Sequence, residues 1–201
     1  MCYPLVELAT AGAFALCVAA LGPTLPALKY SIFSAILITL IASDFEERIL
    51  PDEFTLGGVA IGIALAAFVP LGPEIAFVLL PMSSGPALRS VGEAVVGAAF
   101  SSGSIWLVGW LYRKLRHREG LGFGDVKMIA MIGAFLGLKA ALLTLIAASL
   151  FGAVGGLVYI FVTGKDASTY ELPFGSFLGL AALSVAMFGE VVMVWYSRMG
   201  S

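Results

Sequence analysis

Residues 28–44 read LKYSIFSAILITLIASD, and this stretch decides the class of fold. Between Ser31 and Ser43 it contains no charged side chain, and it ends at Asp44. Backbone polar groups cannot stay unpaired in lipid, so an apolar run of this length predicts a membrane-spanning helix rather than an isolated strand. A carboxylate at the edge of such a helix is costly and marks a candidate functional position.

The composition extends this interpretation to the whole chain. Of the 201 residues, 60% are hydrophobic and 12% are charged, and the mean hydropathy is +1.03. Soluble domains are nearer to half apolar and a quarter charged, so lipid is the expected solvent for the excess apolar surface. The net charge of −2 does not suggest nucleic acid as a partner.

Further apolar segments predict helices of the same kind on either side of residues 28–44. The full set of expected spans is about 5–21, 28–44, 54–70, 91–112, 125–137, 139–162 and 174–196. The sequence shows neither the alternation of a β-barrel nor a domain boundary. We therefore expect an all-α polytopic transmembrane bundle of about seven spans, with residues 1–201 forming a single membrane-embedded domain.

Basic residues predict the orientation of this bundle. They are densest in the loop after the fourth segment, which should therefore be cytoplasmic: Arg113, Lys114, Arg116 and Arg118. Counting spans outward from this loop places residues 44–53 and 163–173 on the same side. It also places the N-terminus in the cytoplasm.

Two carboxylates then fall at the same depth, just inside the cytoplasmic face. Asp44 ends one span, and Asp125 begins another after the glycine-rich stretch 120–124. Two carboxylates held close cannot both ionise cheaply, so the pair is expected to share one proton. The ionised member can take a proton from water while the neutral member protonates a carbonyl oxygen or a leaving amine. This is the arrangement of an aspartic protease.

Asp125 also has a purely structural interpretation, because an acidic residue at the start of a helix often caps it. Gly122 and Gly124 precede it and carry no Cβ. They would permit unusual dihedral angles and a close approach of the backbone at this point.

Four segments resemble, in the same order, motifs of the type IV prepilin peptidases. Gly122-Phe-Gly-Asp-Val-Lys127 is similar to the GxGD signature of that family of membrane aspartic proteases. The other three are Tyr3-Pro-Leu-Val-Glu7, Asp44-Phe-Glu-Glu-Arg-Ile-Leu-Pro-Asp52 and Leu172-Pro-Phe-Gly175. The resemblance covers positions 3 to 175 and implies the GxGD-type fold, with Asp44 and Asp125 as the catalytic pair. It also implies that Pro173 and Gly175 lie beside this pair, either to align the substrate or for packing alone.

The resemblance further implies an endopeptidase of the bacterial inner membrane. It would remove the basic leader of a prepilin or pseudopilin at the cytoplasmic face, after a glycine that ends the leader. Membrane lipid is the other expected partner. Proteolysis of this kind needs no covalent intermediate, metal or organic cofactor. S-adenosylmethionine would be used only if the methyltransferase activity of the family is retained.

Larger members of that family carry an N-terminal cysteine-rich zinc loop, and this sequence contains no CxxC motif. Its cysteines, Cys2 and Cys17, cannot supply a four-ligand site, so we expect no structural zinc. The chain is interpreted as a short form of the family, either natural or truncated, and its methyltransferase activity is left open.

Other charged residues near the expected site have two interpretations each. Glu46 and Glu47 in the loop 44–53 would either dock a basic leader or form an ordinary solvated surface. Lys127 would either interact with a nearby carboxylate or extend toward the lipid headgroups. Glu7 would hydrogen-bond near the active site or, as we prefer, to another helix. Glu93 is expected at the interface of the opposite face, near Arg89.

Two other classes of function are compatible with a membrane protein that carries paired acids. A small proton-coupled transporter would use Asp44 and Asp125 as protonatable acids near the middle of the bilayer, and an inverted repeat would favour it. A non-catalytic assembly platform for a secretion apparatus would place the two carboxylates too far apart to share one water.

Overall fold

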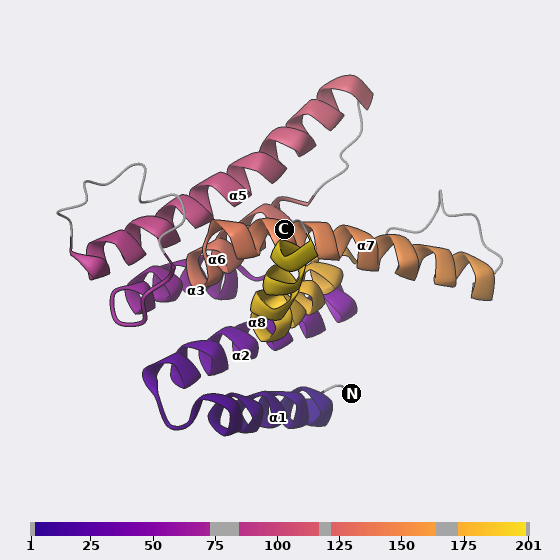
Figure 1. Ribbon diagram of the computed structural model, residues 1–201. Helices are drawn as coiled ribbons and strands as arrows, with labels where there is room; N and C mark the ends of the chain where they lie inside the picture. Colours follow the sequence, from indigo (N-terminus) through magenta and orange to yellow (C-terminus); the bar gives the residue numbers. More distant parts are fainter. Residues whose placement is uncertain (1–2, 73–84, 117–121, 164–172, 200–201) are drawn as a thin grey trace.

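The computed structural model describes residues 3–72, 85–116, 122–163 and 173–199, and these ranges are helical with short connections and without strands (Figure 1). The helices are α1 (Tyr3–Leu21), α2 (Leu25–Glu47), α3 (Asp52–Ala66), α5 (Pro86–Arg116), α6 (Phe123–Leu136), α7 (Leu138–Thr163) and α8 (Phe174–Met199). Each contains or overlaps one of the predicted spans, so the predicted all-α polytopic bundle is confirmed.

Helix lengths divide the bundle into long and short members. In the described part of the chain, four helices are long and apolar enough to cross a membrane: α1, α2, α5 and α7. By contrast, α3 has 15 residues and α6 has 14. At 1.5 Å per residue α6 is roughly 21 Å long, which is shorter than the roughly 30 Å hydrocarbon core of a bilayer. Of the two, α6 is buried along most of its length, whereas α3 exposes apolar side chains such as Phe54, Leu56 and Ile61.

Local sequence signals set several helix ends. Thr24 caps the start of α2, where its hydroxyl oxygen accepts a hydrogen bond of 3.4 Å from the N–H of Ala27. Gly137 separates α6 from α7 with a positive φ of 84°, a conformation that glycine adopts without strain. The predicted span 54–70 runs beyond α3, because the chain tightens into three-residue turns after Ala66.

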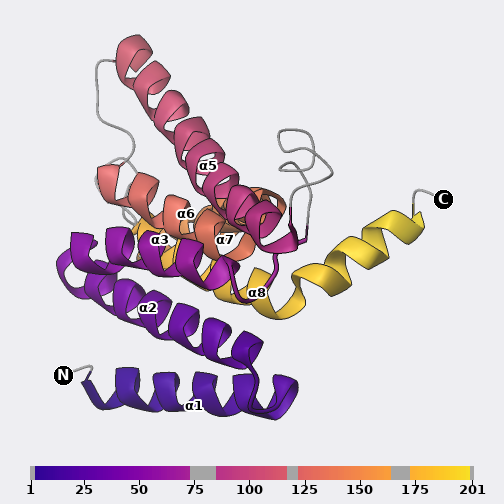
Figure 2. The same ribbon diagram turned by 90° about the vertical axis from the view of Figure 1, so that its left-hand side faces the viewer.

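The core is built around α6, which is buried on nearly all sides. Its buried residues pack with those of α2 and α8, and the rings of Phe33 and Phe135 lie 4.9 Å apart. In Figure 2, α5 lies on one side of α3, α6 and α7, and α2 and α1 lie on the other. α1 contacts α2 and exposes large apolar side chains such as Leu5 and Leu8, as expected of a helix that faces lipid.

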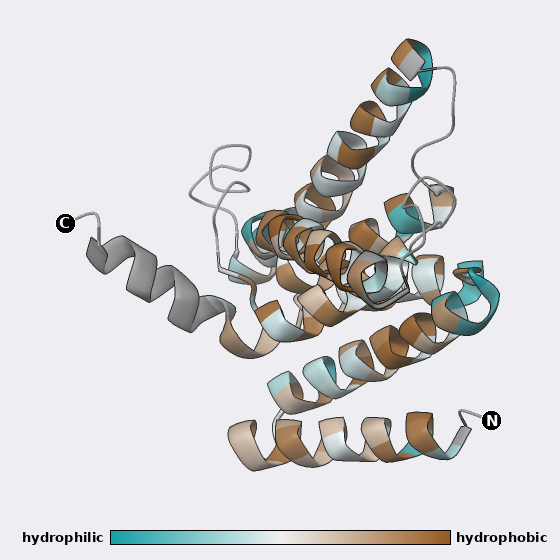
Figure 3. Cartoon of the chain, turned by 90° about the vertical axis from the view of Figure 1, so that its right-hand side faces the viewer, coloured by the Kyte–Doolittle hydropathy of each residue, from teal (hydrophilic) through white to brown (hydrophobic). Residues whose placement is uncertain are grey.

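Polar residues gather at the ends of the helices. Figure 3 shows them at the corner between α2 and α3 and at the end of α5, while the helices are mostly apolar along their length. α1 and α2 run antiparallel, so the N-terminal end of α1 lies on the same side as the end of α2 (Figures 1 and 2).

α5 and α6 pack with their backbones in contact. A Cβ on Gly97 would lie 2.6 Å from the carbonyl oxygen of Gly133, and a Cβ on Gly133 would meet Gly97 in the same way. Ser101 donates a hydrogen bond of 3.2 Å to the carbonyl of Ile129 across the same contact. Small residues at a helix crossing permit this approach in membrane proteins.

Two acids lie outside the site, and the structure adds the face of the helix on which each lies. Glu93 is only 1% exposed, because it lies on the face of α5 that turns toward the bundle, together with Ser90, Gly97 and Ser101. Counting spans gives the depth of such a residue but not the face of the helix on which it lies. Glu7 is exposed on α1 and makes no hydrogen bond to another helix in the described part of the chain, so the preferred interpretation is wrong.

Candidate active site

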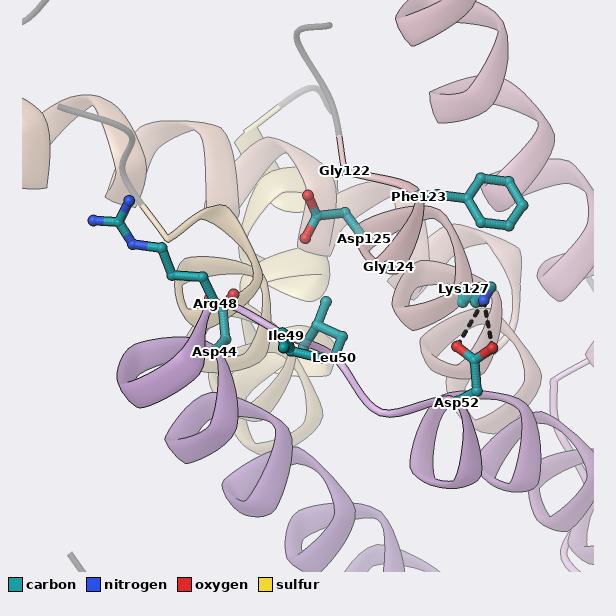
Figure 4. A pocket seen from close by; sticks show the side chains of 10 residues that line it. All are labelled: Asp44, Arg48, Ile49, Leu50, Asp52, Gly122, Phe123, Gly124, Asp125 and Lys127. Carbon is teal, nitrogen blue, oxygen red and sulfur yellow. Dashed lines mark hydrogen bonds and ion pairs between the residues drawn. The ribbon is translucent and has the colours of Figure 1, made fainter. Parts of the chain in front are cut away.

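Asp44 and Asp125 line one pocket of about 350 Å³ (Figure 4). Asp44 lies in the last turn of α2 and is 6% exposed, whereas Asp125 lies in the first turn of α6 and is 8% exposed. α3 begins beside the same pocket, and α8 begins against Asp44. One helix therefore ends, and three begin, around the two carboxylates, so side chains far apart in the sequence converge there.

The start of α8 holds the carboxylate of Asp44 in place. Both the backbone N–H and the hydroxyl of Ser176 donate to Oδ2 of Asp44, at 2.6 Å and 2.7 Å. Ser176 lies in the first turn of α8, where unpaired N–H groups and the helix dipole favour an anion. Ser176 was not among the residues predicted from the sequence, because the aspartate that it holds lies 132 residues away.

Glycines around the pocket provide space rather than unusual dihedral angles. A Cβ on Gly175 would lie 3.0 Å from Oδ2 of Asp44, and one on Gly122 would lie 3.2 Å from Oδ2 of Asp125. A Cβ on Gly124 would lie 3.1 Å from the side chain of Leu50. Gly122 has a φ of −69°, which any residue can adopt, so only the expectation of close approach is met.

The expected loop 44–53 is mostly helical. Residues 44–47 form the last turn of α2, residues 52–53 begin α3, and only residues 48–51 connect them. Arg48 ends α2 with a φ of 55°, and its N–H donates to the carbonyl of Asp44 at 3.1 Å. The hydroxyl of Ser43 donates to the carbonyl of Ile49 at 2.8 Å. These bonds direct Leu50 into the space left by Gly124 and Gly175.

Lys127 pairs with a carboxylate, but with neither of the two buried ones. Its ammonium group donates to both oxygens of Asp52 at 2.6 Å and 2.7 Å, as Figure 4 shows. The same nitrogen lies 5.0 Å from the centre of the Phe123 ring. Lys127 therefore joins the start of α6 to the start of α3 beside the pocket.

The remaining predicted site residues lie outside the pocket. Glu46 and Glu47 are exposed in the last turn of α2 and are not among the residues that line it. Pro173 immediately precedes α8 and is half-buried. Its ring fixes the backbone where the chain enters the helix that holds Asp44. The part these three residues take in substrate binding stays a prediction.

Two buried carboxylates at one pocket, each on a different helix, define the chemistry of the site. Their charges are close enough to interact. A like charge nearby and removal from water both disfavour a doubly ionised pair of carboxylates. Such a pair can activate a water and protonate an oxygen or nitrogen of a substrate, which is the chemistry of aspartic proteases.

The fold and this site define a polytopic helical membrane protein with an aspartate pair, and the comparisons with known proteins name its family. The chain belongs to the type IV leader peptidase family, whose sequence profile matches residues 31–157. That range includes both Asp44 and Asp125. Family membership confirms the resemblance and does not support the proton-coupled transporter.

Curated relatives match almost the whole chain. A prepilin leader peptidase/N-methyltransferase of Xanthomonas campestris is 34% identical over an alignment of 202 positions, which covers 98% of this chain and 62% of the relative. One of Aeromonas salmonicida is 31% identical over 96% of the chain and 60% of the relative. One of Pseudomonas aeruginosa is 29% identical over 96% of this chain and 61% of the relative. This chain therefore spans about 62% of the length of the relative from Xanthomonas. No solved structure matches it.

Proposed function

We propose that this chain is an intramembrane aspartic endopeptidase that removes the basic leader from prepilin-like precursors at the cytoplasmic face of the membrane. The observation that carries the proposal is the meeting of Asp44 and Asp125, both buried, in one pocket. Family membership supports the same chemistry, and the relatives are named as prepilin leader peptidases. An assembly platform would need no such pocket.

In the proposed reaction the aspartate pair activates one water. The ionised carboxylate takes a proton from the water, whose oxygen attacks the carbonyl carbon of the scissile peptide. The neutral carboxylic acid gives its proton to the carbonyl oxygen. The amine then leaves with a proton from the pair, and no covalent intermediate forms. None of these steps needs zinc, and S-adenosylmethionine would enter only if N-methylation is retained.

The proposed substrate is a prepilin or pseudopilin with a lysine-rich leader and a following apolar segment. The leader would lie in the cytosol of a bacterium, and the apolar segment would enter the inner membrane beside the bundle. The antiparallel arrangement of α1 and α2 supports an N-terminus on the same side as the pocket (Figure 1). Cleavage would follow the glycine that ends the leader.

Leader cleavage by the purified chain tests the proposal. The substrate is a synthetic peptide with several lysines, one glycine at the expected cleavage site and an apolar tail, and mass spectrometry locates the cut. We expect cleavage after the glycine by the wild type and no detectable product from Asp44→Asn or Asp125→Asn. Both substitutions keep the shape of the side chain and remove its titrating group. Near wild-type cleavage by either variant would refute the catalytic assignment.

A further inference from the structure

The two carboxylates of the pocket differ in their anchoring. Oδ2 of Asp44 accepts both the N–H and the hydroxyl of Ser176. In the described part of the chain Oδ1 of Asp44 accepts no hydrogen bond, so one oxygen is fixed and the other is available. Among the described residues no side-chain hydroxyl donates to the carboxyl group of Asp125, which has a backbone hydrogen bond with Gly122 instead.

Hydrogen bonds of this kind distinguish between the two protonation states of a carboxyl group. Two donors aimed at one oxygen favour the ionised carboxylate, and they leave no place on that oxygen for a proton. The first turn of α8 adds the positive end of the helix dipole. Ser176 is 3% exposed, so water cannot readily replace its hydroxyl at this position.

We propose that Ser176 is a positioning residue that keeps Asp44 ionised, so that Asp44 is the base of the pair and Asp125 carries the shared proton. This inference rests on the proposed peptidase function. In the first step a water O–H bond breaks, its oxygen bonds to the peptide carbon, and its proton goes to Oδ1 of Asp44. Asp125 gives its proton to the carbonyl oxygen. The C–N bond then breaks as Asp44 returns a proton to the nitrogen and Asp125 recovers one from the diol.

Charged groups from three helices share the pocket with Asp44. Asp125 faces it from α6, and Arg48 lies at the end of its own helix. Asp52 and Lys127 line the pocket as an ion pair with each other. Ser176 is a neutral donor whose side-chain hydroxyl bonds to the carboxylate of Asp44.

Ser176→Ala tests the inference, with Ser184→Ala as the matched control. Ser184 lies on the same helix and donates 2.8 Å to the carbonyl of Leu180, so it makes a local bond only. Loss of a hydrogen bond to a charged group typically changes an equilibrium constant by about tenfold to a hundredfold. We therefore expect the kcat of Ser176→Ala to be lower than that of the wild type by about tenfold or more. KM should stay within about twofold of the wild type, because the hydroxyl does not touch the substrate.

The pH profile provides the readout that a purely structural role would not change. Loss of the hydroxyl removes a donor that favours the ionised carboxylate. The acidic limb of kcat/KM should therefore move to higher pH by about one unit, while Ser184→Ala keeps the wild-type profile. A kcat within twofold of the wild type, or a lower kcat with an unmoved acidic limb, would overturn the inference. A wild type that cannot cleave the lysine-rich peptide at all would instead refute the proposed function.

Discussion

Position 175 has no room for a side chain, because the Asp44 carboxyl group occupies the space beside it. A Cβ there would lie 3.0 Å from two atoms of that group and 3.1 Å from Leu50. Asp44 cannot easily yield, since Ser176 holds it by two short hydrogen bonds. Gly175 and Ser176 therefore fix the position of the Asp44 carboxylate together.

Gly175→Ala should consequently impair the reaction more than the fold. A displaced carboxylate loses its alignment with water and substrate, and a shift of about 1 Å can cost about a hundredfold in rate. We expect kcat to fall between about tenfold and a hundredfold, measured with the lysine-rich peptide. Gly152→Ala is the control, because a Cβ on that glycine of α7 meets nothing within 4 Å. Equal activity of the two variants would show that Asp44 adapts freely.

The two acids of the pocket can be recognised in the sequence, but the serine that holds one of them cannot. Asp44 and Asp125 stand out because carboxylates at the edge of apolar segments are costly. Ser176 does not stand out, because serine is common in helices of membrane proteins, and its partner is 132 residues away. Only the tertiary structure joins the start of α8 to the end of α2.

The pocket is formed where the ends of four helices meet. α2 ends and α3, α6 and α8 begin at one place, which brings their terminal residues into a single pocket. α6 is the central element, since it carries Asp125 at its start and packs against α3, α5, α7 and α8 along its length. Any change that moves α6 should therefore move Asp125.

Gly97→Ala tests this dependence through the contact between α5 and α6. The added Cβ would lie 2.6 Å from the backbone oxygen of Gly133, and a backbone cannot move aside as a side chain can. Overpacking of this kind costs about 1–3 kcal/mol, so we expect a lower melting temperature in detergent and a lower kcat. Gly103→Ala on the same helix meets nothing within 4 Å and should behave as the wild type. If both variants have the same melting temperature as the wild type, α5 and α6 are not in close contact.

Hydropathy was sufficient to predict the helices but not their arrangement. Each predicted span corresponds to one helix, because lipid leaves the backbone few alternatives. The buried face of α5 could not be assigned from the sequence, so the burial of Glu93 was not predicted. The central place of α6 also escaped prediction, since its apolar residues surround the helix and mark no single face.

The whole molecule is apolar on its helices and charged at their ends. The corner between α2 and α3 is one such polar region in Figure 3, and it carries the exposed acids Glu46 and Glu47. The proposed leader is basic and would approach from this side. Opposite charges at a membrane surface assist encounter and initial binding more than the chemical step.

Substitution of Glu46→Gln together with Glu47→Gln should therefore raise KM for a leader with several lysines and leave kcat nearly unchanged. Because such attraction is screened over about 8 Å at physiological ionic strength, KM of the variant should also depend less on salt than that of the wild type. A neutral leader is the control and should not distinguish the two enzymes. An unchanged KM and salt response would identify these acids as an ordinary solvated surface.

The central claim is that Asp44 and Asp125 act as one catalytic unit, and comparison of single and double substitutions tests it most directly. The leader-cleavage rates of Asp44→Asn, Asp125→Asn and the double variant would be measured on folded protein at equal concentration. Members of one catalytic unit are strongly non-additive, so each single variant should lose about as much activity as the double variant. The dyad would be contradicted if the rate loss of the double variant equalled the product of the two single losses. Substantial cleavage by either single variant would contradict it as well.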